Sequence, residues 1–123
     1  MNWKECQAEK LIKHDSRAWE RIPVSISAAE RFLRSAQKNL EIDEYEMVQL
    51  AAYNSAFHSA RALLFSKGYT ERSHSCLSIA LKHLYKDDPL LLKLVNVFDK
   101  MRISRHNVQY AELLLLSKKP YFL

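Results

Sequence analysis

The chain has one glycine and three prolines among its 123 residues, so it is poor in the residues that form tight turns. β-rich domains need many such turns, because hairpins favour glycine at positions with positive φ. An all-β fold is therefore disfavoured. The glycine-rich loops that hold phosphate in Rossmann and P-loop proteins are missing as well, since neither GxGxxG nor GxxxxGK[ST] occurs.

Apolar residues recur at intervals of three and four, which is typical of helices with one buried face. We expect a short helix or two in the first 24 residues, ended by Pro23. The next segment, SISAAERFLRSAQKNLEI (25–42), opens with Ser27 and Glu30 at the spacing of a capping box. The longest helix is expected from about Asp43 to Lys67, followed by Gly68 at a position where helices commonly end.

Two more helices are expected in the second half of the chain. Ser73 caps one that runs to about Tyr85, and the turn at residues 87–89 opens the next, with Pro89 near its start. A last helical piece ends at Pro120, and its leucine block (113–116) suggests packing against another chain. The sequence predicts one all-α domain (1–123), a four- to five-helix antiparallel up-and-down bundle.

Two cysteines, Cys6 and Cys76, lie far apart and form no CxxC motif. We expect no disulfide framework, and free thiols fit a reducing cytosol. The polar N-terminus has no signal-peptide core and no run of ~18 apolar residues occurs, so the prediction is a cytoplasmic protein without membrane contact. No histidine pair has metal-ligand spacing, so neither a metal nor a cofactor is expected.

The stretch MRISRHNVQY (101–110) gathers cationic and polar groups where the apolar pattern should continue. On a helix, Arg102, His106 and Tyr110 stand at i, i+4 and i+8, and Arg105 is adjacent. These residues either complement the dipole of a solvated helix end or form a face that meets phosphate. The net charge of +5 and the pI of about 9.3 are compatible with a nucleic-acid partner.

Two further sets of polar residues allow two interpretations each. Asn54, His58 and Arg61 form a strip on the long helix, which is either a buried network fixing helix register or part of the groove of the arginine–histidine face. His74 follows Ser73 at a helix start, where it either packs near the Gly68 loop or accompanies a phosphate at the helix N-terminus.

Three pieces of the chain together resemble the HEPN family of small helical-bundle proteins. NWKECQAEKLIK and AERFLRSAQKNLE are similar to its opening tryptophan segment and first bundle helix. AAYNSAFHSARALLFSKGYTERSHSCL resembles its core pair of helices, and RHNVQY is similar to an arginine-containing segment that ends in tyrosine.

The resemblance implies a homodimer, often encoded beside a minimal nucleotidyltransferase as a partner. Many HEPN members are metal-independent ribonucleases that act as toxins, with an arginine followed by a histidine after four to six residues. Here only three residues separate Arg102 from His106, and Gln109 stands where the family often has an acid. The motif is thus a shortened version of the ribonuclease signature.

Two functions follow from this resemblance. The first is a toxin–antitoxin-like, nucleotidyltransferase-linked component that contacts RNA or nucleotide phosphate, as an endoribonuclease in which Arg102 or Arg105 holds the phosphate and His106 transfers protons. The second is a non-catalytic dimeric module that binds a nucleotide or a protein partner. Asn54, His58, Arg61 and Tyr110 are the expected binding residues.

Overall fold

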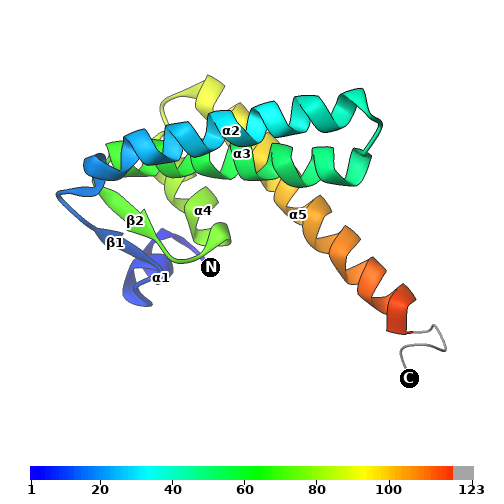
Figure 1. Cartoon of the computed structure of the whole chain (residues 1–123). Helices are drawn as coiled ribbons and strands as arrows, with labels where there is room; N and C mark the ends of the chain where they lie inside the picture. The colour runs from blue at the N-terminus through cyan, green and yellow to red at the C-terminus, as the bar shows by residue number, and fades with distance from the viewer. Residues whose placement is uncertain (118–123) are drawn as a thin grey trace.

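A computed structural model describes the backbone of residues 1–117 and the side chains of residues 1–105. Helices make up most of this part of the chain, which confirms the predicted all-α bundle (Figure 1). The elements in chain order are α1 (Trp3–Ala8), β1 (Ile12–His14), the 3-10 helix η1 (Ala18–Arg21), α2 (Ile22–Glu41), α3 (Tyr45–Ser66), β2 (Tyr69–Glu71), α4 (His74–Leu84) and α5 (Pro89–Ser117).

The two long helices α2 and α3 form an antiparallel hairpin and lie side by side along their length (Figure 1). Small residues allow this close approach, because Ala28, Ala29 and Ala36 of α2 and Ala51 of α3 are all buried. The hydroxyl of Ser55 donates a hydrogen bond of 2.8 Å across the interface to the carbonyl of Ala29. This hairpin is the frame on which the other helices pack.

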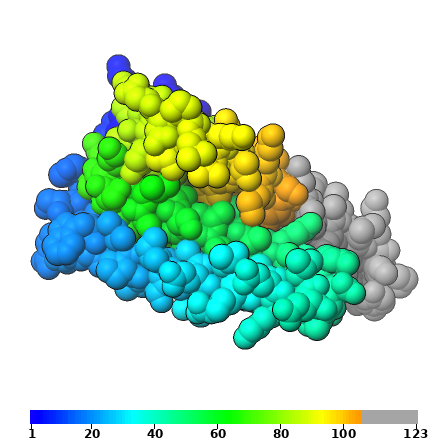
Figure 2. Space-filling model, turned by 90° about the horizontal axis from the view of Figure 1, so that it is seen from above, coloured from blue at the N-terminus to red at the C-terminus, as the bar shows by residue number. Residues whose placement is uncertain are grey.

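Helix α5 packs against α3 and α4 through Val95 and Phe98, which are both buried. Seen from above, its yellow and orange residues lie against the green of α3 (Figure 2). The C-terminal half of α5 then leaves the α2–α3 hairpin obliquely (Figure 1). The helix runs unbroken from Pro89 to Ser117, so the separate last helical piece expected from the sequence is instead part of α5.

Helix boundaries follow the local signals at Ser73, at the turn before Pro89 and at Gly68. Ser73 caps α4 by accepting a hydrogen bond from the backbone N–H of Cys76, and Asp88 accepts one from Leu91 at the start of α5. Gly68 follows α3 with φ +82°, in the left-handed region that favours glycine. The expected start of the first long helix was wrong.

Helix α2 begins at Ile22, so Pro23 lies in its first turn and does not end the preceding segment. A proline is tolerated there because the first backbone N–H groups of a helix have no intrahelical acceptor. Ser27 and Glu30 consequently lie inside the helix, and the capping box predicted at Ser27 does not form.

The first 21 residues fold against the start of α4 and the end of α3. Strand β1 pairs antiparallel with β2, with Ile12 opposite Glu71, and this small sheet was not expected. The ring of Trp3 stacks on His83 of α4 with centroids 4.7 Å apart. Cys6 and Ile12 are almost fully buried, so this segment contributes to the main core.

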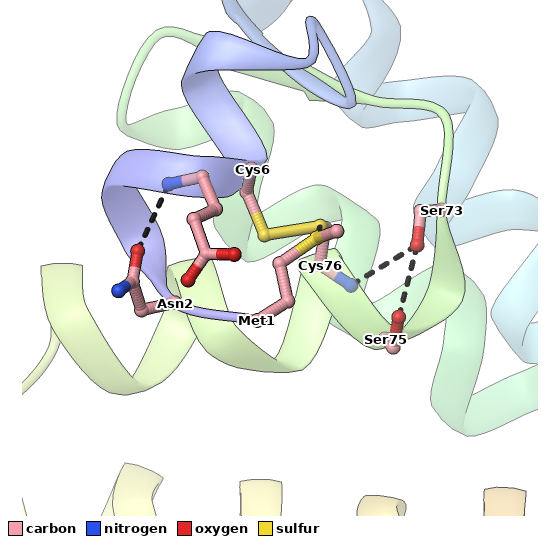
Figure 3. Close-up of a disulfide and its surroundings, with 7 residues drawn as sticks. Met1, Asn2, Cys6, Ser73, Ser75 and Cys76 are labelled. Atoms are coloured by element: carbon pink, nitrogen blue, oxygen red, sulfur yellow. Dashed lines mark hydrogen bonds between the residues drawn. A yellow bond between two sulfur atoms is a disulfide. The ribbon is translucent and has the colours of Figure 1, made fainter.

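Cys6 and Cys76 form a disulfide that joins α1 to the first turn of α4 (Figure 3). The expectation of two free thiols was therefore wrong. The two cysteines are 70 residues apart in sequence, but the packing of α1 on α4 brings their Cα atoms to 5.8 Å. The sulfur of Met1 lies 3.5 Å from that of Cys76.

Candidate functional site

Arg105 is held against the ring of Tyr53, at the crossing of α5 and α3. Its guanidinium carbon lies 4.8 Å from the centroid of the Tyr53 ring, a cation–π contact. Its Nε atom is buried and has no hydrogen-bond partner within residues 1–105. No carboxylate of these residues pairs with Arg105 either. The structure thus positions a cation whose charge is not balanced by a described acid.

Tyr53 joins this arginine to His74 at the start of α4. Its hydroxyl lies 2.7 Å from Nδ1 of His74, and the His74 ring stacks on Phe57 with centroids 4.1 Å apart. Burial raises the pKa of Tyr53 even though the charge of Arg105 opposes this, so the phenol stays protonated. Burial and the charge of Arg105 lower the pKa of His74, so its neutral form is favoured.

Arg102 is one turn away on α5 and has an acidic neighbour. Its Nε atom lies 3.6 Å from Asp99, whose other carboxylate oxygen lies 2.5 Å from Nζ of Lys82 on α4. Burial alone would raise the pKa of Asp99, but the hydrogen bond from Lys82 and the nearby cations outweigh it and the pKa is lowered. Asp99 stays ionised and offsets part of the charge of Lys82 and Arg102, which leaves Arg105 as the more available cation.

A groove of about 520 Å³ opens beside Arg105, between the first half of α3 and α5. Its size is within the range of small-molecule sites. Apolar side chains supply much of its wall, and Arg105, Ser104 and Lys100 supply polar groups on the α5 side. The apolar members are Met47, Val48, Leu50, Ala52 and Met101.

The strip expected on α3 is engaged in other contacts. Asn54 donates a hydrogen bond of 3.0 Å to the carbonyl of Leu50 in its own helix, and His58 stacks on Phe32 of α2. Burial lowers the pKa of His58, and the charge of Arg61 acts in the same direction.

Arg61 itself forms an ion pair of 2.6 Å with Glu71 of β2, and its guanidinium packs over Phe57 and Phe65. Asn54, His58 and Arg61 thus each contact a different neighbour, and within the described residues they do not hydrogen-bond to one another as the predicted network would require. His106 and Tyr110 lie on the helical backbone of α5, but their side chains are outside the described residues.

Neither Tyr53 nor Asp99 is predicted from the sequence to belong to the site, and the sequence allows two interpretations of His74. Tyr53 has the spacing of a core residue and is indeed buried, so only its hydroxyl reveals a second role. The signal for His74 was its position after the N-cap Ser73, which places it on the first turn of α4. Nothing in the sequence indicated that this turn faces Arg105.

Within the described residues, no three histidine, cysteine or acidic side chains gather as a metal site would require. The helices of this part of the chain are also too short or too polar to cross a membrane.

A family model described as the HEPN domain matches residues 22–118, which is most of the chain. The chain belongs to the HEPN family. No curated protein and no solved structure matches it in the corresponding comparisons.

The matched HEPN region contains every residue of the site, from Tyr53 and His74 to Arg102 and Arg105. The segment that carries α1, β1 and η1 precedes it, and so does Cys6. The HEPN match relates the domain to nucleotides and RNA in general terms. The disulfide therefore fastens a segment from outside the match to the first turn of α4, next to His74.

Proposed function

We propose that this HEPN domain binds the phosphate of RNA or of a nucleotide through Arg105, with Arg102 as a neighbouring cation. One observation supports this most directly: Arg105 is fixed over Tyr53, with a buried Nε atom and no acidic partner within residues 1–105. A guanidinium held in this way is preorganised for an anion, because its orientation is set before the ligand arrives.

The surroundings of Arg105 support an anionic ligand over a cationic one. Lys100 lines the same groove as Arg105, where Glu46 is the acid, and Arg102 lies one turn away on α5. Asp99 offsets only part of the charge of Lys82 and Arg102. The net charge of +5 would additionally steer a polyanion toward the protein. RNA binding is expected to weaken as salt rises, because cations on the protein replace counterions on the phosphates.

The first test measures binding of a labelled mixed-sequence RNA by fluorescence anisotropy, for the wild type and Arg105→Gln. We expect Arg105→Gln to lose affinity about tenfold, since it removes a charge-assisted hydrogen bond. The slope of log K against log salt should fall in magnitude by about 1. Arg34→Gln is the control, because Arg34 is exposed on α2 and carries the same charge. Equal losses in both variants would mean that only overall charge matters, and would contradict the proposal.

Cleavage of the bound RNA is a further part of the proposal. It is favoured by the unbroken helix from Pro89 to Ser117, which keeps Arg102 and His106 at i, i+4 spacing through Ile103 and Ser104. An imidazole beside a bound phosphate can take a proton from the 2′-hydroxyl or give one to the leaving 5′-oxygen, without a metal.

The cleavage test incubates labelled RNA with EDTA and compares the wild type with His106→Ala. Wild-type cutting that leaves cyclic-phosphate ends, with a loss of about 10²–10⁴ in rate for His106→Ala, is the expected result. If the RNA stays intact in both reactions while the wild-type affinity is retained, the protein is a non-catalytic binding module.

We also propose a homodimer and a nucleotidyltransferase partner. The homodimer is supported by Leu90, Leu94 and Val97, which stand at i, i+4 and i+7 on α5 and are 66%, 54% and 49% exposed. Light scattering on the purified chain tests the dimer, and Leu94→Glu should shift it to a monomer.

A neighbouring reading frame with a nucleotidyltransferase motif would support the two-gene, toxin–antitoxin-like arrangement.

A further inference from the structure

His74 is held in a defined orientation by two contacts. Its Nδ1 atom lies 2.7 Å from the hydroxyl of Tyr53, and one face of its ring stacks on Phe57 at an interplanar angle of 26°. A histidine that only fills space at a helix start does not need both of these contacts. Together they set the direction of the remaining ring nitrogen, Nε2.

The hydrogen bond between Tyr53 and Nδ1 of His74 leaves the other ring nitrogen, Nε2, for a different partner. Burial keeps the hydroxyl of Tyr53 protonated, and this neutral hydroxyl can donate to Nδ1 or accept from it, depending on the tautomer of His74. A neutral imidazole that accepts at Nδ1 carries its own hydrogen on Nε2. His74 is an exposed residue, and Nε2 has no hydrogen-bond partner within residues 1–105. In the imidazolium form both ring nitrogens carry hydrogen, so Nε2 is then a free donor.

His74 and Arg105 both contact Tyr53, so Nε2 of His74 belongs to the surroundings of Arg105. The ring of Tyr53 carries Arg105 on its face and His74 at its hydroxyl, so one side chain positions both groups. The charged groups that act on His74 are Arg105 and Arg102 from α5 and Arg61 from α3. All three are cations, and Tyr53 is neutral, so the local field favours an anion at this position.

We propose that His74 is a second anion-binding residue of this site, donating a hydrogen bond from Nε2 to the phosphodiester that Arg105 contacts, so that RNA affinity depends on pH. This inference rests on the proposed function. Protonation places a hydrogen on Nε2 whichever tautomer the neutral ring has, and it adds a positive charge beside the phosphate. By linkage, the bound anion must then favour the imidazolium form and raise the pKa of His74.

The test measures RNA affinity between about pH 8 and about pH 5 for the wild type, His74→Gln and His14→Gln. RNA is a suitable probe because phosphodiesters do not titrate in this range. His14→Gln is the control, since His14 lies on β1 and contacts Tyr69 instead of the site. All three chains are also compared in a His106→Gln background, which removes the other histidine next to Arg105.

We expect wild-type affinity to rise about five- to tenfold from the high to the low end of this range, as one added charge beside a phosphate would produce. His74→Gln should lose most of this rise in both backgrounds, and His14→Gln should keep it. In NMR spectra of the histidine rings, added RNA should raise the pKa of His74, and the resonances of His14 should not move.

Failure of the role of His74 and failure of the proposed function give different results. If His74→Gln keeps the wild-type pH profile while Arg105→Gln still weakens binding, the role of His74 is refuted and the proposed function stands. If Arg105→Gln binds RNA as the wild type does, the proposed function itself fails. Circular dichroism confirms that each variant is folded before its affinity is compared.

Discussion

At the scale of single residues, the site depends on which charges are balanced. Arg61 is paired with Glu71, and Asp99 is shared by Lys82 and Arg102. Arg105 has no such partner within residues 1–105 and lies against an aromatic ring instead. A paired arginine would have to give up its carboxylate to bind phosphate, whereas Arg105 loses no ion pair on binding.

Asp99→Asn should lower the stability of the fold by about 1 kcal/mol near neutral pH, because Lys82 and Arg102 lose their shared carboxylate. The effect is modest because Lys82 is 43% exposed and its charge is screened. The pKa of Asp99 is lowered in the folded state, so the stabilisation is present above the ordinary carboxyl pKa. It is lost as the pH falls through the lowered folded value.

Urea denaturation at neutral and acid pH checks this prediction, with Asp87→Asn as the control at an exposed turn position. The wild type and Asp99→Asn should converge in acid. A stability difference that stays constant with pH would show that the carboxylate charge is not responsible.

At the scale of elements, the first turn of α4 positions the histidine of the site. Ser73 caps this turn, His74 follows, and Cys76 anchors it to α1. A change in the cap should therefore affect both stability and the histidine, because the two depend on the same turn.

Ser73→Ala should cost about 1 kcal/mol, since the backbone N–H of Cys76 loses its acceptor. Thermal or urea denaturation measures this loss. Ser27→Ala is the control, because Ser27 is exposed on α2 and its side chain makes no hydrogen bond within residues 1–105. Equal effects of the two substitutions would argue against a capping role for Ser73.

At the scale of the whole molecule, the disulfide attaches the first 21 residues to the HEPN region. The segment also contributes buried side chains, including Ile12 and Ala18, so it is part of the core and not a free extension. The cross-link closes a long loop, and long loops have the most entropy to lose in the unfolded chain.

Replacing both cysteines by alanine should reduce stability by about 4 kcal/mol, as expected for a closed loop of this length. Reduction of the wild type by a dithiol should give a similar loss. Mass spectrometry after alkylation of the unfolded, non-reduced protein should find no free thiol. Two alkylated cysteines in that sample, or an unchanged denaturation midpoint in the double variant, would contradict this prediction.

The sequence by itself determined the helices, most of their ends and the family. Those features depend on neighbours within one or two turns: the apolar spacing, Ser73 as a cap, Gly68 after α3 and Pro89 at the start of α5. Local signals fail where two of them compete, as at Pro23 and Ser27. There the chain could end a helix at the proline or begin one, and in the structure α2 begins before the proline, at Ile22.

Only the tertiary structure decided which side chains meet. The Cys6–Cys76 bond, the pairing of β1 with β2 and the contact of Tyr53 with His74 and Arg105 all join residues more than 20 positions apart. The tertiary structure also decided the partner of Arg61, which the helix pattern placed beside Asn54 and His58 but which is paired with Glu71 of β2. A single sequence shows which face a residue occupies, but the angle and register at which helices pack determine which residue lies opposite.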